Sequence, residues 1–208
     1  MSSTSDAAQT VLAPRSLSLE APIVCVSASL AAILCIAPLV WHAKAKNFAA
    51  VSLIVWIVLL NVVVAVNAAV WSHNDPHAWW DGVGYCDVTV NLLIGYQLAL
   101  PGATAVLLRS LVKVMDATAA SRVVGTAERR RDAAVAVVLC VALPLLFMAC
   151  SYPFRLYRYV IWTTNGCSVV FSQTWAAMIF VVMWPVLVSM LSAYYTGECF
   201  LSAAPPHD

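Results

Sequence analysis

The stretch that decides the fold covers residues 85–113 and reads YCDVTVNLLIGYQLALPGATAVLLRSLVK. Its apolar run extends from Val88 to Val112, with Cys86 before it and Lys113 after it. At about 1.5 Å per residue, a helix of this length crosses a bilayer core and its interfaces. Pro101 lies inside the run, and membrane helices tolerate such prolines because their neighbours satisfy the freed carbonyl groups. We therefore expect this stretch to be the central helix of a membrane bundle.

The composition of the whole chain supports a membrane fold. Of its 208 residues, 62% are hydrophobic and only 10% are charged. A soluble domain carries about a quarter charged residues. So little charge cannot cover a water-soluble fold of this size, and lipid is the alternative solvent. The fold class predicted is all-α, a multi-spanning helical bundle.

The apolar runs divide the chain into five expected spans. They lie at about residues 21–41, 48–70, 88–112, 133–152 and 173–195, with a tail before them at 1–20 and a short tail after them at 196–208. The connections after the first and third spans hold most of the loop lysines and arginines. Because such loops stay in the cytoplasm, we expect the N-terminus outside and the C-terminus inside.

Two cysteines fall on the predicted outer side. Cys86 stands at the head of the third span, and Cys167 lies in the loop between the fourth and fifth spans. An oxidising exterior permits a disulfide between them, which would tie that loop to the central helix. The alternative is a pair of unrelated free thiols.

Polar and aromatic residues supply the other candidate sites. Three amides lie within spans and are expected to form interhelical hydrogen bonds, with or without a role in signalling: Asn61, Asn67 and Asn91. The candidates on the outer side for facing a ligand are Trp71, Trp79, Trp80, Tyr85 and Asp87. The aromatic residues among them can equally form an interfacial belt. The inner basic residues can contact an acidic partner, or can fix the topology and anchor lipid head groups: Lys44, Lys46, Arg109, Lys113, Arg129, Arg130 and Arg131.

Other function classes find little support in the sequence. No Ser/His/Asp set, zinc-protease motif or glycine-rich phosphate loop is present, so no enzyme is predicted. No cysteine and histidine cluster suggests a metal, and we expect no cofactor and no nucleic-acid partner. Carriers of ions or protons usually hold ionisable residues within their spans. Here only the inner end of the third span has one, Arg109.

Several short motifs resemble the fungal lipopeptide-pheromone receptors, the a-factor-receptor type of G-protein-coupled receptor (class D). The matching stretches, which extend over about residues 20–198, are HAKAKN at 42–47, NAAVW at 67–71, YCD at 85–87, NGC at 165–167, and PVL at 185–187 with SAYY at 192–195. Each motif alone is weak, but their order and spacing together are specific.

The resemblance implies a function that the spacing alone does not. Such receptors lie in the plasma membrane, bind a secreted farnesylated peptide outside and activate a heterotrimeric G protein inside, and a receptor oligomer is allowed. Arg109 matches the family position for basic residues at the inner end of the third span, although Ser110 replaces one of the usual basic neighbours. Pro101, Pro144 and Pro185 are expected places for helices to bend.

The family has seven spans, whereas this sequence contains five expected ones. The resemblance therefore leads us to expect an incomplete copy of a receptor that signals weakly or not at all. The alternative is a non-signalling five-span membrane protein derived from such a receptor, either a regulator or a relic.

Overall fold

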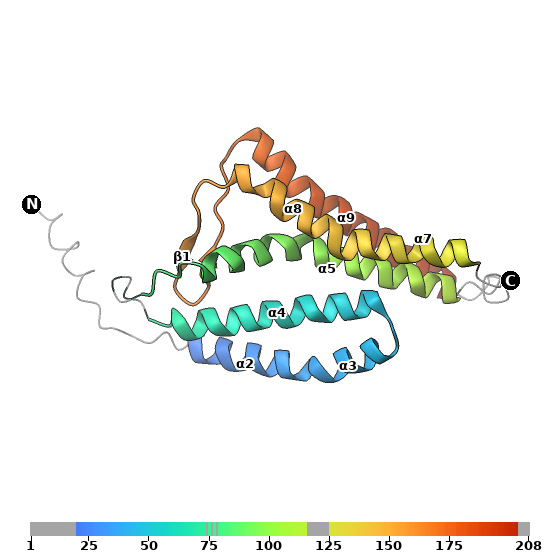
Figure 1. The fold of residues 1–208 in the computed structure, drawn as a ribbon, viewed down its shortest axis with the longest axis horizontal. Helices are drawn as coiled ribbons and strands as arrows, with labels where there is room; N and C mark the ends of the chain where they lie inside the picture. The colour runs from blue at the N-terminus through green and yellow to red at the C-terminus, as the bar shows by residue number, and fades with distance from the viewer. Residues whose placement is uncertain (1–19, 74, 76, 78, 116–124, 204–208) are drawn as a thin grey trace, which may run out of the picture.

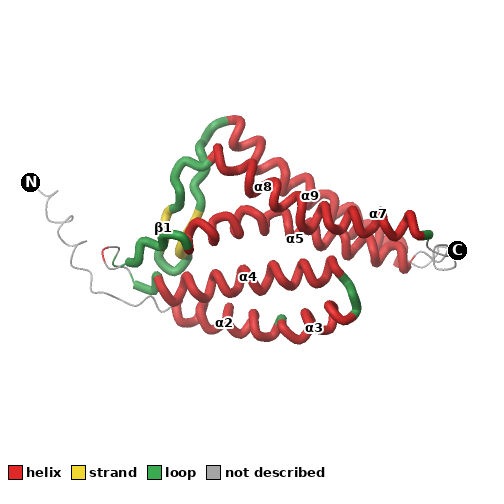
Figure 2. The backbone as a smooth tube through the Cα atoms, in the orientation of Figure 1, coloured by secondary structure: helices red, strands yellow, loops and turns green. Residues whose placement is uncertain are grey.

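The computed structural model describes residues 20–73, 75, 77, 79–115 and 125–203 (Figures 1 and 2). In order, its helices and strands are α2 (Glu20–Leu34), α3 (Ile36–Lys44), α4 (Phe48–Val70), α5 (Tyr85–Met115), α7 (Thr126–Val137), the π-helix η2 (Val138–Ala142), α8 (Leu143–Ser151), the 3₁₀ turn η3 (Tyr152–Phe154), β1 (Val160–Trp162), β2 (Gly166–Ser168) and α9 (Trp175–Ala203). Five helical stretches among the described residues are long and apolar enough to cross a membrane. The predicted membrane-helix bundle is confirmed.

Helix α5 is the centre of the bundle. It packs against α4 on one side and against α8 and α9 on the other, while α2 packs against α4 (Figure 1). Cys86, Val90, Ile94 and Leu98 follow one another at every fourth residue of α5, and all four are fully buried. This spacing places them on one face of the helix, which forms the main core.

The first expected span is two helices instead of one. The helical pattern is interrupted at Cys35, between α2 and α3. Pro38 explains the interruption, because it has no N–H group to donate to the carbonyl of Leu34. The second expected span, 48–70, has the same bounds as α4.

Three helices are longer than the expected spans. Helix α5 extends to Met115, and α7 begins at Thr126, inside what the sequence suggested was a loop. Carboxylates of α7 pair there with cations of α5, which favours helix beyond the apolar run. Helix α9 reaches Ala203, although a tail was expected from residue 196. Thr196 and Cys199 stay within this helix, and the Cys199 thiol lies 3.7 Å from the Leu108 carbonyl of α5.

Helix α5 and the π-helix η2 approach each other closely beside Pro101. A Cβ atom on Gly102 would lie 2.6 Å from the carbonyl oxygen of Leu139 in η2, so only glycine fits there. On the other side, the Ser192 hydroxyl of α9 donates to the Pro101 carbonyl at 2.7 Å. Two of the expected bend sites lie beside this contact between α5 and the π-helix. Pro101 precedes Gly102 in α5, and Pro144 lies at the start of α8, just after η2.

The connection at residues 154–172 is a β-hairpin where the sequence suggested only a loop. Strands β1 and β2 pair antiparallel, with Ile161 opposite Cys167. The pairing continues toward the helices through the bridge between Arg155 and Phe171. The hairpin lies beside the start of α5 (Figure 1). We call this the disulfide end of the bundle, and the opposite end, with Lys113 and α7, the basic end.

Candidate functional site

A disulfide between Cys86 and Cys167 holds the hairpin to the central helix. Both residues are fully buried, their Cα atoms lie 5.3 Å apart, and 81 residues separate them in the sequence. The bond therefore links the first turn of α5 to strand β2. The two cysteines are those that the sequence analysis paired.

Asn67 makes the second attachment of the hairpin. Its Nδ2 donates to the Asn165 carbonyl at 2.7 Å, and its Oδ1 accepts from the Tyr85 hydroxyl at 2.9 Å. The Thr164 amide donates to the Trp71 carbonyl at 2.8 Å. Because one buried amide joins α4, α5 and the hairpin turn, these three elements are fixed relative to one another.

Three aromatic rings gather beside the disulfide. Trp71, Trp80 and Tyr85 lie with ring centroids 6.0 to 6.1 Å apart. Trp71 is 0% exposed, and its indole N–H donates to the Trp80 carbonyl at 3.2 Å. The expectation that Trp71 faces a ligand is therefore not met, because its ring is buried and packs against Trp80 and Tyr85. Trp80, by contrast, is 50% exposed and stacks on Trp71.

Two other expected site residues have local partners. Trp79 is partly buried, and its indole N–H donates to the His73 carbonyl at 2.7 Å. Asn61 donates to the Ile57 carbonyl of its own helix at 2.8 Å. The expected interhelical role of Asn61 is therefore wrong in the described structure, because the amide is satisfied one turn back along α4.

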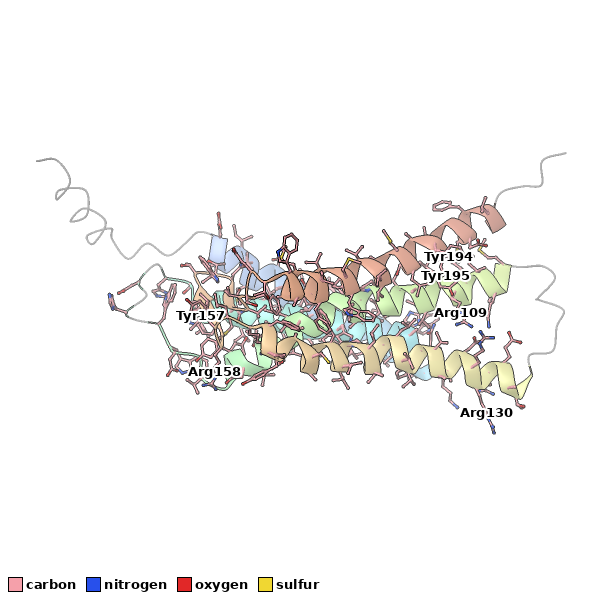
Figure 3. The ribbon with its side chains drawn as sticks, turned by 90° about the horizontal axis from the view of Figure 1, so that it is seen from above. Arg109, Arg130, Tyr157, Arg158, Tyr194 and Tyr195 are labelled. Carbon is pink, nitrogen blue, oxygen red and sulfur yellow. A yellow bond between two sulfur atoms is a disulfide. The ribbon has the colours of Figure 1, made fainter. Side chains whose placement is uncertain are left out.

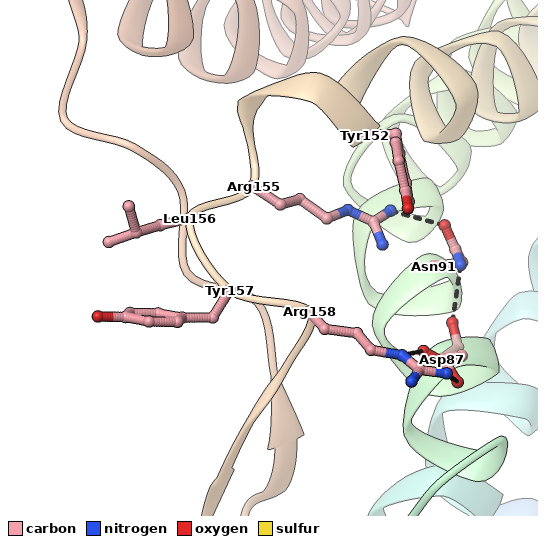
Figure 4. A pocket seen from close by; sticks show the side chains of 7 residues that line it. All are labelled: Asp87, Asn91, Tyr152, Arg155, Leu156, Tyr157 and Arg158. Atoms are coloured by element: carbon pink, nitrogen blue, oxygen red, sulfur yellow. Dashed lines mark hydrogen bonds and ion pairs between the residues drawn. The ribbon is translucent and has the colours of Figure 1, made fainter.

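A polar pocket of about 590 Å³ lies between the start of α5 and the segment after α8 (Figure 4). Its lining residues are Asp87, Asn91, Tyr152, Arg155, Leu156, Tyr157 and Arg158. Arg158 binds the Asp87 carboxylate through two hydrogen bonds of 2.7 and 2.6 Å. This hydrogen bonding raises the pKa of Arg158 above its usual value. Within the pocket, Arg158 therefore occupies both oxygens of the Asp87 carboxylate.

Arg155 is bound differently from Arg158. One of its terminal nitrogens donates to Asn91 Oδ1 at 2.7 Å, while Asn91 Nδ2 donates to the Asp87 carbonyl. Asn91 thus connects α5 with the hairpin segment instead of with another helix. Burial lowers the pKa of Arg155, and its Nε atom has no hydrogen-bond partner among the described residues.

A smaller apolar cavity of about 80 Å³ lies deeper in the bundle, between α5, α8 and α9. Its lining residues are Leu98, Leu143, Leu146, Phe147, Cys150, Phe180 and Trp184. Phe180 stacks on Phe147 and on Phe154, with ring centroids 5.8 and 5.2 Å apart.

The lysines and arginines predicted for the inner side fall into two groups. Arg109 contacts Asp132 at 2.9 Å, and Lys113 contacts Asp132 at 2.7 Å and Glu128 at 3.1 Å. These two cations are therefore engaged within the bundle. The remaining candidates are exposed: Lys44, Lys46, Arg129, Arg130 and Arg131. Figure 3 shows Arg109 and Arg130 at the end opposite Tyr157 and Arg158.

Sequence reasoning missed three residues that shape these sites, Arg155, Arg158 and Asp132. One signal was available for the arginines, because a carboxylate at the head of an apolar run, such as Asp87, needs a partner. Which of the two arginines serves Asp87 depends on the hairpin. The described residues contain no group of three side chains suited to a metal.

Comparison with known proteins identifies the family. The pheromone A receptor family matches residues 23–204. The chain is 31% identical to the pheromone a factor receptor of Saccharomyces cerevisiae over 80% of its own length, and 29% identical to the pheromone M-factor receptor of Schizosaccharomyces pombe over 81%. It is also 32% identical to the pheromone B beta 1 receptor of Schizophyllum commune over 77%.

The chain covers only part of these relatives, namely 35% of the S. cerevisiae receptor, 45% of the S. pombe receptor and 29% of the S. commune receptor. No solved structure matches it. The match nevertheless extends from the first helix to the end of the last one described. With its five span-length helices, the chain is a multi-pass membrane protein that belongs to the pheromone A receptor family.

Proposed function

We propose that this chain binds a farnesylated peptide pheromone at its disulfide end and couples to a heterotrimeric G protein at its basic end. It does so in the plasma membrane with its N-terminus outside. The family supports a pheromone receptor, and the different chemistry of the two ends supports this division of roles. One end carries a disulfide and a gathered aromatic surface, while the other carries exposed arginines.

The observation that carries the ligand proposal is the exposed ring of Trp80. Its indole stacks on the buried Trp71, beside the disulfide and Tyr85. An apolar prenyl chain and a flat indole bind well, particularly when the indole is held rigidly before the ligand arrives. Trp80 is then the contact residue, while Trp71 and Tyr85 hold it in place. Trp79 and Asp87 support the neighbouring loop and hairpin through their own bonds.

The orientation is argued from charge and from redox chemistry. Lys44 ends α3 and Lys46 lies in the connection to α4, and Arg129 to Arg131 lie on α7 at the same end. Short loops rich in lysine and arginine remain cytoplasmic. A disulfide persists in an oxidising compartment, which fits the outside. The charge distribution and the disulfide both support a disulfide end that lies outside, with the exposed cations available to the G protein.

The test of ligand binding uses the purified chain in lipid nanodiscs. The probes are fluorescent peptides that end in S-farnesyl-cysteine methyl ester, compared with the same peptides lacking the farnesyl group. We expect Trp80→Ala to weaken binding by about tenfold, as for an aromatic residue at the centre of an interface. Trp41→Ala is the matched control, because Trp41 is 66% exposed on α3 near the basic end. Equal affinity of the two variants would contradict the proposed contact.

A further inference from the structure

Arg155 carries a positive charge that forms no ion pair with any of the described residues. The polar pocket contains two guanidinium groups and one carboxylate, and Arg158 already holds both oxygens of Asp87. No carboxylate of the described residues lies within ion-pair distance of Arg155, whose neutral partner is Asn91. Its buried Nε atom finds no acceptor within the part of the chain that the structure describes. A buried donor without an acceptor is costly, so this atom indicates a ligand that supplies oxygen.

The pocket opens at the side of α5, away from its buried face. Cys86 and Val90 lie in the core, and Asp87 and Asn91 each follow one position later, about 100° further around the helix. Val88 comes next and is 61% exposed. The residues that bind the two arginines therefore lie between the core and the outer surface of the bundle. Figure 4 shows both arginines reaching from the hairpin segment toward this side of α5.

An exposed apolar strip ends at the same pocket. Leu145, Ala149 and Tyr152 lie three and four residues apart along α8 and η3, and all three side chains are exposed. Tyr152 also lines the pocket, and its ring lies 5.4 Å from the guanidinium of Arg155. The helical stretches suited to cross the membrane end here, at Phe154 and Tyr85. The pocket therefore lies at the height expected for lipid head groups, and the apolar strip beside it offers a surface for acyl chains.

We propose that the polar pocket holds the phosphate of a membrane phospholipid, whose acyl chains lie along Leu145, Ala149 and Tyr152. Arg155 supplies its free N–H groups to the phosphate, and the planar guanidinium suits that geometry. Asp87 limits the affinity because it keeps Arg158 occupied. The continuous apolar strip favours a phospholipid over a free anion, since a free anion would use only the arginine. The bound lipid would brace the hairpin against α5 from its outer side.

The test is native mass spectrometry of the purified chain with added phosphatidylglycerol or phosphatidylcholine. We expect Arg155→Gln to reduce lipid occupancy by about tenfold, whereas Arg155→Lys keeps part of it because the charge remains. Asp87→Asn releases Arg158 and should increase occupancy. Arg130→Gln is the matched control, because Arg130 is an exposed arginine at the opposite end. An intact disulfide and an unchanged helix content by circular dichroism show that each variant is folded.

Two further probes identify the source of the oxygen ligand. Diacylglycerol with the same acyl chains lacks the phosphate, and we expect it to bind at least tenfold more weakly. Inorganic phosphate lacks the chains and should not displace the phospholipid. Equal binding of diacylglycerol, equal loss in Arg155→Gln and Arg130→Gln, or displacement by inorganic phosphate would each overturn the proposal.

Discussion

Only glycine can occupy position 166 in this structure. A Cβ atom there would lie 2.4 Å from Cγ of Asn67, and its φ of +66° is a left-handed conformation. We predict that Gly166→Ala lowers the free energy of unfolding by about 1–3 kcal/mol, through backbone strain and displacement of Asn67. Thermal unfolding in detergent measures it. Gly197→Ala is the control, because a Cβ there meets nothing within 4 Å, and it should be neutral or stabilising.

The two asparagines of α4 should differ sharply on substitution. Asn67 bonds both Asn165 and Tyr85, whereas Asn61 bonds only its own helix. We predict that Asn67→Ala costs about 2–3 kcal/mol of unfolding free energy, since the Asn165 carbonyl and the Tyr85 hydroxyl both lose their bonds to this buried amide. Asn61→Ala should cost less than about 1 kcal/mol. Similar losses in unfolding temperature for the two variants would contradict the assignment of Asn67 as the joint between α4, α5 and the hairpin.

For single residues, the sequence predicted which side chains matter better than it predicted the contacts that they make. It selected Cys86 and Cys167 because they fall on the same side of the predicted topology. It could not separate Trp71 from Trp80, because both lie in one aromatic stretch and only the tertiary packing around the disulfide buries one of them. Asn61 and Asn67 likewise share a helix, and their different partners depend on which face meets the hairpin.

At the scale of elements, hydrophobic length predicted helices well and predicted irregular structure poorly. The bounds of α4 were predicted because an uninterrupted apolar run sets them. Pro38 divides the first span, although prolines elsewhere in the chain remain inside helices, as Pro101 does. The hairpin escaped prediction because β1 and β2 have three residues each. Strands this short have no periodicity to detect.

The ion pairs between α5 and α7 give a prediction about these two elements. Asp132 contacts both Arg109 and Lys113, whereas Glu128 contacts only Lys113. These groups are partly exposed, so each pair is screened by solvent. We predict that Asp132→Asn lowers stability by about 1 kcal/mol and Glu128→Gln by less. High salt should shrink the difference between the two unfolding temperatures, and a difference that salt leaves unchanged would argue against an ionic cause.

The disulfide gives a prediction about the hairpin. Cys86 and Cys167 close a loop over 81 positions, for which chain entropy alone allows about 4 kcal/mol of stabilisation. The gain should be smaller in a membrane, where the intervening helices already restrict the unfolded chain. We predict that the double variant Cys86→Ala, Cys167→Ala unfolds at lower temperature but keeps its helix content by circular dichroism. Loss of helix content would mean that the hairpin supports the whole bundle.

At the scale of the whole molecule, the two ends of the bundle have opposite chemistry. The disulfide end contains the hairpin, the half-exposed Trp80 and a polar pocket in which one guanidinium forms no ion pair with the described residues. The basic end contains the exposed arginines of α7 and the paired cations of α5. The chain belongs to the pheromone A receptor family. The proposed binding of a pheromone requires that the disulfide end lies outside the cell.

The measurement that tests this claim most directly is labelling of introduced cysteines on intact cells with a membrane-impermeant maleimide. Trp162→Cys reports the disulfide end and Arg130→Cys the basic end, because both side chains are exposed. The unsubstituted chain measures the background from its native thiols. We predict that the cysteine at position 162 is labelled on intact cells and the one at position 130 only after permeabilisation. The reverse pattern would place the hairpin inside and contradict the proposed pheromone site.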